Sequence, residues 1–272
     1  MRLQVNQIRV GYDEKTIVHD LTITIPDGKV TTIIGANGCG KSTLLKAITR
    51  IIPYQSGAVI LDGENIQKTN TKKLAQELAI LPQSPESASG LLVEELVSYG
   101  RYPYQKGFGN LTEKDRSVIE WALQATNTAM FRKQTVDALS GGQRQRVWIA
   151  MALAQETDII FLDEPTTYLD MAHQLEVLEL LQELNEKEGR TIVMVLHDLN
   201  QAARFSDYMI ALNQGHLIKE GTPEEVMTHD TLERVFQIDA VIGEDPRTKK
   251  PMCITYNLIE EKVDEPIPSI QR

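Results

Sequence analysis

The sequence is poor in cysteine and has no long hydrophobic run. Its two cysteines, Cys39 and Cys253, are far apart, and no Cys-x-x-Cys pair occurs. This excludes a zinc knuckle or a disulfide framework and suits a reducing cytosol. No stretch of about 18 apolar residues is present, so no helix is expected to span a bilayer. The amino-terminal residues lack the apolar block of a signal peptide. Any membrane role is therefore expected to come through a partner.

Positive charge is also scarce. Lys and Arg number 28 against 38 Asp and Glu, which gives a formal net charge of −10. Binding to nucleic acid needs clustered basic residues that neutralise phosphates, so no nucleic-acid partner is expected. The same excess of negative charge argues against simple electrostatic docking on anionic lipid. The charge is first of all a statement about solubility.

What the chain does contain is enough apolar sequence for a large core, with 42% hydrophobic residues in a length of 272. Residues 3–10 and 17–25 alternate between apolar and polar positions, which predicts two antiparallel strands. Two apolar runs, 158–163 and 191–196, are separated by a helical stretch at 172–188. Strand, helix and strand in succession predict a right-handed crossover and a parallel sheet.

A segment with a different pattern of polar and apolar residues interrupts this alternation of strands and helices. Residues 86–154 begin in a polar, loop-like stretch and continue with helical spacing. We interpret them as a helical subdomain inserted into an α/β core formed by residues 1–85 and 155–242. Together these parts form one domain, 1–242. Residues 243–272 contain several prolines and form a C-terminal tail for which the pattern predicts no element.

A glycine-rich loop follows the short apolar run of residues 30–34 and precedes a helical stretch. It matches the pattern G-x-x-x-x-G-K-[S/T] in the strand-to-helix context that supports nucleotide binding. The predicted ATP-binding residues of the loop are Gly35, Asn37, Gly38, Cys39, Gly40, Lys41, Ser42 and Thr43. Its backbone N–H groups and the helix N-terminus are expected to hold phosphates. Lys41 would reach the β- and γ-phosphates, and Ser42 would ligate Mg²⁺.

Two adjacent carboxylates end the apolar run of residues 158–163. Asp163 lies at the carboxyl end of this predicted strand, where a carboxylate can hold Mg²⁺ through water, and Glu164 follows it. Glu164 can orient or deprotonate an attacking water molecule. Pro165 disfavours helical backbone angles at Glu164 and so directs its side chain away from the strand end.

A second short motif, Leu139-Ser140-Gly141-Gly142-Gln143, carries the resemblance to a family. It is similar to the signature of the ATP-binding cassette (ABC) ATPases. Ser140 can cap a helix or donate to a phosphate, and Gly141 and Gly142 expose N–H groups at a helix start. The resemblance implies that Ser140, Gly141, Gly142 and Gln143 close over the nucleotide of a second subunit, which makes a homodimer with two shared sites.

The resemblance also implies roles for four isolated residues. His197 resembles the switch histidine that contacts the γ-phosphate, and Gln83 resembles the Q-loop glutamine that touches Mg²⁺ and the attacking water. Tyr12 resembles the aromatic residue that stacks on adenine. Asp170 falls in the D-loop, facing the partner subunit. The implied fold is a P-loop NTPase with a RecA-like parallel sheet, an antiparallel β subdomain and an inserted α-helical subdomain.

The chain departs from the commonest family pattern at a few positions. Ala36 and Cys39 replace the usual Pro and Ser of the loop, and Thr167 and Tyr168 replace small residues before Asp170. Because backbone donors bind the phosphates, the loop changes are expected to have little effect. Cys39 lies beside a helix N-terminus, so we expect a lowered thiol pKa and inhibition by alkylation, with protection by ATP.

Over nearly the whole chain the resemblance is closest to the ATPases of ferric-siderophore importers, especially the ferric-hydroxamate type. The segments that carry it include residues 81–86, 90–109, 143–170 and 197–207. Importers of cobalamin, haem or another metal chelate look similar, and a soluble ABC ATPase of iron–sulfur cluster assembly is the alternative from another class. A non-hydrolysing module would lack the carboxylate at Glu164.

The importer interpretation implies a set of partners and a location. Two membrane-spanning permease subunits would bind the ATPase homodimer, and an extracytoplasmic siderophore-binding protein would act indirectly. The protein would lie on the cytoplasmic face of the cell membrane as a peripheral subunit. Four aromatic residues are candidates either for lining the permease groove or for packing the helical subdomain: Tyr99, Tyr102, Tyr104 and Phe108.

Overall fold

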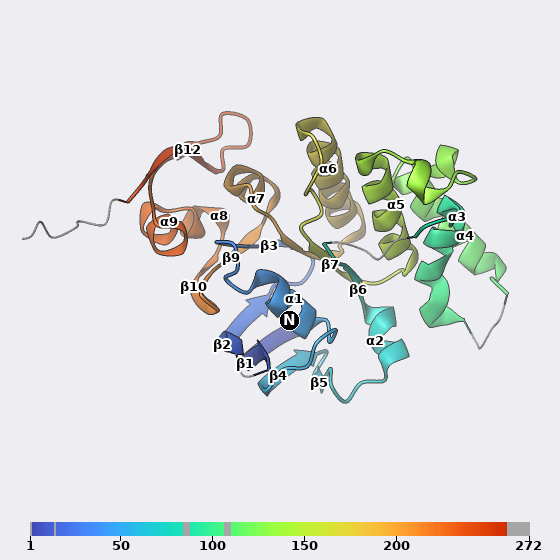
Figure 1. Cartoon of the computed structure of the whole chain (residues 1–272), viewed down its shortest axis with the longest axis horizontal. Coiled ribbons are helices and arrows are strands. Elements are labelled where there is room, and N and C mark those ends of the chain that lie inside the picture. Colours follow the sequence, from blue (N-terminus) through green and yellow to red (C-terminus); the bar gives the residue numbers. More distant parts are fainter. Residues whose placement is uncertain (1, 14, 84–87, 106–109, 260–272) are drawn as a thin grey trace, which may run out of the picture.

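The computed structural model describes residues 2–13, 15–83, 88–105 and 110–259. A large sheet with flanking helices occupies the middle of the molecule, a smaller sheet lies beside it, and a group of helices lies at one end (Figure 1). The fold class predicted from the sequence is confirmed. Among the described residues, no helix is both long enough and apolar enough to cross a membrane.

The large sheet has six strands in the order β10-β9-β3-β8-β7-β6. They are β3 (Val30–Gly35), β6 (Leu78–Leu81), β7 (Ile159–Asp163), β8 (Thr191–Val195), β9 (Tyr208–Asn213) and β10 (His216–Gly221). Neighbouring strands from β9 to β6 are parallel, and only β10 is antiparallel to its neighbour. The carboxyl ends of β3, β7 and β8 therefore share one edge, which brings Gly35, Asp163 and the residues after Val195 together.

The smaller sheet is antiparallel, with strand order β2-β1-β4-β5. Its strands are β1 (Leu3–Tyr12), β2 (Lys15–Ile25), β4 (Ser56–Leu61) and β5 (Glu64–Asn65). The alternation in the first two strands predicted this pairing correctly. Their inward side chains share a core with α1 (Lys41–Ile48) and with Ile33 of β3.

A second core lies on the opposite face of the large sheet. Ile34, the neighbour of Ile33, points into it because successive side chains of a strand face opposite sides. The helices that supply this core include α6 (Met171–Glu188) and α7 (Leu199–Phe205). Gly189 ends α6 with a left-handed backbone (φ 67°), as the sequence predicted. A short helix that the sequence did not predict, α2 (Thr71–Glu77), precedes the edge strand β6.

The inserted helices lie together at one end of the molecule (Figure 1). They are α3 (Val93–Ser98), η1 (Tyr99–Tyr104), α4 (Glu113–Ala125), η2 (Ala129–Phe131), η3 (Val136–Ala138) and α5 (Gly141–Ala154). Arg101 is 1% exposed and joins three of them. Its guanidinium donates to Asp115 of α4 (2.8 Å) and to the carbonyl of Ala154 in α5 (2.9 Å), and it stacks over Tyr104. This buried ion pair fixes η1 against both helices.

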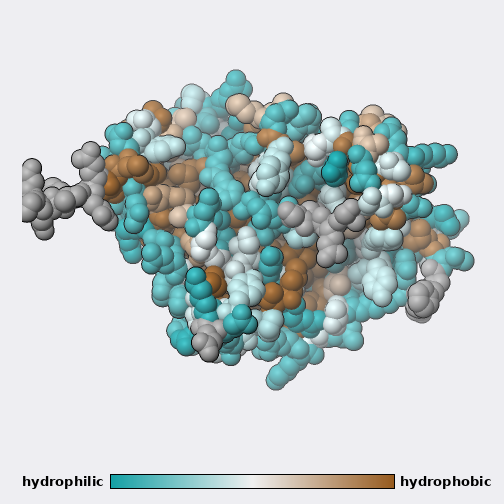
Figure 2. Space-filling view, in the orientation of Figure 1, coloured by the Kyte–Doolittle hydropathy of each residue, from teal (hydrophilic) through white to brown (hydrophobic). Residues whose placement is uncertain are grey.

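The C-terminal part of the chain has more structure than its composition predicts. After α8 (Pro223–Val226) and α9 (His229–Phe236), strands β11 (Ile238–Glu244) and β12 (Pro251–Leu258) form an antiparallel hairpin. The expected boundary between residues 242 and 243 falls inside β11. Pro251 is the first residue of its strand, a position that tolerates proline. Hydrophobic surface is visible at this end of the molecule in Figure 2, and Leu258 is 80% exposed.

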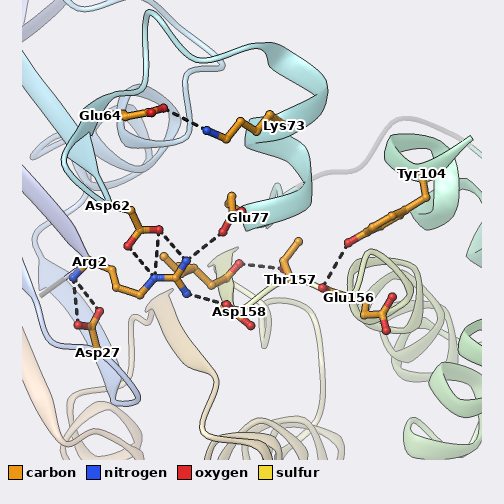
Figure 3. A network of polar contacts seen from close by, with 11 residues as sticks. Arg2, Asp27, Asp62, Glu64, Lys73, Glu77, Tyr104, Glu156, Thr157 and Asp158 are labelled. Carbon is orange, nitrogen blue, oxygen red and sulfur yellow. Dashed lines mark hydrogen bonds and ion pairs between the residues drawn. The ribbon is translucent and has the colours of Figure 1, made fainter.

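Arg2 contacts acidic residues from several elements at the end of the fold opposite the glycine-rich loop (Figure 3). The Arg2 guanidinium donates to Asp62 (2.7 Å), Glu77 (2.9 Å) and Asp158 (2.7 Å), and its backbone N–H donates to Asp27 (3.0 Å). Arg2 holds the pKa of Asp62 below its usual range. These contacts join the antiparallel sheet to α2 and to the start of β7.

Candidate nucleotide site

The glycine-rich loop connects β3 to α1, as predicted. Gly35 has φ 156°, and a Cβ there would lie 2.4 Å from the carbonyl oxygen of Leu212, so a side chain would not fit. Gly40 caps α1 with φ 106° and no side-chain hydrogen bond. The first N–H groups of α1 therefore have no side-chain cap and point toward the loop, as an anion site requires.

The lysine of the loop is folded back onto the backbone. The ammonium of Lys41 donates to the carbonyls of Gly35 (2.8 Å) and Ala36 (3.1 Å), and the residue is only 5% exposed. A buried ammonium needs such hydrogen-bond partners. It is therefore held at the loop, and the acceptors it uses are neutral carbonyls.

A cleft of about 230 Å³ opens over this loop. The residues that line it come from the antiparallel sheet, the loop and the strand ends: Tyr12, Ile17, Asn37, Gly38, Gly40, Lys41, Ser42, Thr43, Glu164 and His197. Tyr12 is 48% exposed at the end of β1, so its ring is available to a ligand. The structure thus brings most of the predicted ATP-binding and catalytic residues to one cleft.

A hydroxyl and a carboxylate meet on the floor of the site. Ser42 Oγ donates to Asp163 Oδ1 at 2.9 Å, and Asp163 is 2% exposed. Burial raises the pKa of Asp163, while the bond from Ser42 lowers it. Mg²⁺ is commonly held by one or two protein oxygens together with phosphate oxygens and water. The chemistry of this pair fits such an ion.

The carboxylate of Glu164 is the centre of a second polar cluster. Its Oε1 lies 2.6 Å from Nε2 of His197, and its Oε2 accepts hydrogen bonds from Gln83 and from Thr167 (3.1 Å). Glu164 is 9% exposed and has a left-handed backbone (φ 54°). This φ lies outside the right-handed helical region that Pro165 disfavours, but it is not the extended backbone that a following proline favours. Of the predicted catalytic residues, His197 and Gln83 therefore both contact Glu164 directly.

Thr167 is a partner of Glu164 that the sequence did not predict. Thr167 lies three residues after Glu164, where the turn carries its hydroxyl back to the carboxylate. A hydroxyl three residues after a carboxylate in a turn is the one available signal, and it is weak.

The Ser-Gly-Gly motif lies away from this cleft. Ser140 caps α5 by accepting from the N–H of Gln143, and the Gln143 side chain accepts from the N–H of Ser140. A Cβ on Gly141 would meet nothing within 4 Å, so the helix start is open to an approaching molecule. A Cβ on Gly142 would touch the ring of His173 at 2.8 Å. None of these four motif residues lines the cleft of the same chain.

Asp170 also lies outside the cleft. It caps α6 by accepting from the N–H of His173 (3.0 Å), and it lies 2.8 Å from that residue's Nδ1. The bond from the His173 N–H keeps the pKa of Asp170 below its usual range. The preceding Tyr168 is 91% exposed with φ 64°. This turn therefore presents an acidic and an aromatic side chain at the surface.

The expectation of a lowered thiol pKa at Cys39 was wrong. Cys39 is 4% exposed, and burial raises the pKa of its thiol; the nearby charge of Lys41 only partly offsets this. A Cβ on Gly35 would lie 2.6 Å from the sulfur, so the thiol is directed back into the loop. The favourable potential of the helix start is outweighed by the loss of water around the sulfur.

Comparison with known proteins supports the resemblance to ABC ATPases that the sequence motifs indicated. Residues 18–167 match the family model described as ABC transporter. The iron(3+)-hydroxamate import ATP-binding protein FhuC of Bacillus subtilis (strain 168) is 61% identical over 96% of this chain and 97% of its own length.

Two solved structures extend the match to the fold. An inward-facing metal-chelate type ABC transporter has 27% identity and a TM-score of 0.80, over 93% of this chain and 96% of that one. The dimeric bacterial ABC transporter cassette MJ0796 has 28% identity and a TM-score of 0.72, over 81% and 98%. The sequence match and the nucleotide cleft agree, and the chain belongs to the ABC transporter family.

Proposed function

We propose that this protein is the ATP-hydrolysing subunit of an importer for ferric hydroxamate siderophores. The observation that carries the proposal is the end-to-end similarity to the hydroxamate import ATPase, at 61% identity. The alternatives from the sequence, an importer ATPase for cobalamin or haem and a soluble ATPase of iron–sulfur assembly, have no comparable support.

ATP binding follows from the cleft. The ring of Tyr12 would stack on adenine, and the loop N–H groups from Asn37 to Thr43 would hold the phosphates. Lys41 would exchange two neutral carbonyl acceptors for the charged β- and γ-phosphates, which are stronger acceptors. Ser42 and Asp163 would hold Mg²⁺, with Gln83 reaching toward it; when bound, this ion neutralises charge on the phosphates.

Hydrolysis would use the Glu164 cluster. The carboxylate would accept a proton from the attacking water, and Gln83 and Thr167 would orient it by donating to Oε2. His197, bonded to the other oxygen, would contact the γ-phosphate from the adjacent strand end. Oε2 of Glu164 is held by two side-chain donors, whereas Oε1 contacts only His197 among the described residues. The His197 side of the carboxylate would therefore move more easily when nucleotide binds.

Two copies would be needed for a complete site. Ser140, Gly141, Gly142 and Gln143 form an open helix start that does not line its own cleft. A second copy placed head to tail would bring this helix start over the phosphates, with Asp170 at the same interface. The cassette structure reported as a dimer supports this arrangement for the family.

The permease subunits would dock on the helical subdomain. Tyr99 and Tyr102 are 55% and 72% exposed on η1, whereas Tyr104 packs under Arg101. We therefore assign the first two to the permease groove and the third to packing. Phe108 lies outside the described residues. Docking of two permease subunits would place the protein on the cytoplasmic face of the cell membrane, with a siderophore-binding protein acting from the other side.

The cargo is tested by growth and uptake rather than by the cassette alone. A strain lacking this gene should fail to take up radioactive iron from a ferric hydroxamate and should keep its uptake from haem. The Lys41→Ala variant serves as the matched inactive control, because it should not restore uptake. Normal hydroxamate uptake in the deletion strain would contradict the proposed cargo.

The shared site is tested separately. ATP hydrolysis per molecule should fall steeply when the protein is diluted below its association range. A rate per molecule that does not change with dilution would contradict the need for a second copy.

A further inference from the structure

His197 lies between two elements of unequal rigidity, strand β8 before it and helix α7 after it. Before it, β8 is paired on both sides, with β3 and with β7. After it comes α7, a helix of only seven residues. Asp198 caps this helix by accepting from the N–H of Gln201 (2.8 Å). Because the strand cannot shift without breaking the sheet, the place of the imidazole depends on what holds the first turn of α7.

The first turn of α7 is bonded to the C-terminal hairpin. The side-chain amide of Asn200 donates to the carbonyl of Cys253 (3.1 Å) and accepts from the N–H of the same residue (2.7 Å). This amide occupies the place that the peptide group of a neighbouring strand would take beside β12. Both polar groups of one strand residue are thus satisfied by a single side chain three residues after His197.

The other end of α7 is held by the same hairpin. The ammonium of Lys250 donates to the carbonyl of Ser206, the residue that ends the helix, at 2.5 Å. A cation at this position also interacts favourably with the helix dipole. Since the hairpin contacts both ends of α7, it limits sliding of the helix along its axis as well as rotation.

Between the polar contacts of Asn200 and Lys250, the hairpin packs against α7 through apolar side chains. Cys253 and Ala240 of the hairpin are 7% and 4% exposed and belong to the same core as Ala203 and Phe205 of α7. The amide bonds of Asn200 therefore lie at the border of a dry region, where an unpaired group is costly. Substitution of Asn200 would leave the N–H and carbonyl of Cys253 without these partners.

From these contacts we infer that the β11–β12 hairpin is a brace for α7 and that Asn200 is a positioning residue for His197. The inference rests on the proposed role of His197 in hydrolysis. Asn200 does not line the nucleotide cleft. It acts by fixing where the imidazole stands relative to Glu164, 2.6 Å away.

The expected signature is a loss of turnover without a loss of nucleotide binding. Asn200→Ala releases the first turn of α7, and a displacement of about 1 Å at a reacting group can cost up to about a hundredfold in rate. We expect a fall in kcat of about tenfold. The KM for ATP should change by less than about twofold, because the loop and Tyr12 lie on other strands.

The test is a double-mutant cycle with His197→Ala. Asn200→Ala is measured in the natural background and in the His197→Ala background, by single-turnover hydrolysis with enzyme in excess so that slow rates remain measurable. If Asn200 acts through His197, Asn200→Ala should lower the hydrolysis rate by less than about twofold in the His197→Ala background. Asn257→Ala, an exposed asparagine on the same strand, is the matched control and should keep its turnover.

Three results would count against the inference. An equal fold loss in both backgrounds, or no loss in the natural one, would overturn the brace while leaving the proposed function intact. Full turnover of His197→Ala alone would contradict the proposed role of His197 and the inference with it. If Asn200→Ala does not fold, Asn200→Asp replaces it: the carboxylate keeps the acceptor for Cys253, loses the donor, and suits a helix start.

Discussion

Replacement of Glu164 by Gln changes its basicity and little else. In the structure, Oε2 accepts from Gln83 and Thr167, and Oε1 lies against Nε2 of His197. A glutamine can keep its oxygen toward the two donors and turn its amino group toward the histidine. The side chain has almost the same volume, and the position is 9% exposed, so the packing should survive.

The expected loss in turnover follows from the proposed role of the Glu164 carboxylate as the general base. General-base catalysis contributes about 10²- to 10⁴-fold, or about 2.7–5.4 kcal/mol of the activation barrier. Glu164→Gln should therefore hydrolyse ATP at least about a hundredfold more slowly. Affinity for ATP should not fall, since Lys41 and the loop are untouched and one negative charge near the γ-phosphate is removed. Because ATP then stays bound, the protein should accumulate as a dimer.

Three measurements check this prediction: phosphate release at saturating ATP and Mg²⁺, titration with a fluorescent ATP analogue, and light scattering with and without ATP. Glu220→Gln is the matched control. Glu220 lies on β10, where burial raises its pKa, and it does not line the cleft. Its turnover should equal that of the natural protein. A Glu164→Gln protein with natural turnover would refute the assignment of the base.

Three further predictions concern stability and reactivity. Arg101→Met leaves Asp115 buried without its cation and should lower the free energy of unfolding in urea by about 3–5 kcal/mol; a change below about 1 kcal/mol would contradict the buried pair. Cys39 should react with a maleimide far more slowly in the folded protein than in urea, because burial raises its pKa and covers the sulfur. Equal rates would count against this. Gly142→Ala places a Cβ 2.8 Å from the ring of His173 and should cost about 1–3 kcal/mol in thermal unfolding. Added His173→Ala should restore most of the loss, and a failure to do so would place the clash elsewhere.

Much of the site was predictable because its parts follow strands of one parallel sheet. A loop after β3, a carboxylate pair after β7 and a histidine after β8 must meet at one edge once the strands align. Gln83 was placed in the site only through the family resemblance, since a lone glutamine carries no signal, and its hydrogen bond to Glu164 was not predicted. The thiol of Cys39 was misjudged because the helix start is readable in sequence, whereas the depth of burial is not.

The C-terminal hairpin could not be predicted for a different reason. Its two strands are linked by a turn with proline and charged residues, and β12 has an exposed outer face, so neither alternation nor an apolar run marks it. The hairpin forms because Ala240 and Cys253 find a core surface on α7, a contact between distant parts of the chain. Tertiary packing of this kind overrides local propensity.

The position of β3 sets a requirement for synthesis on the ribosome. β3 carries the phosphate loop, yet its two partners in the sheet are β8 and β9, which are translated more than 150 residues later. In a nascent chain, the phosphate loop is therefore already synthesised while both edges of β3 are still unpaired. Both partner strands are complete only after about residue 213 has left the ribosome. Such edges invite wrong pairing during translation, so newly made chains should depend on chaperones and acquire nucleotide only after β9 is released.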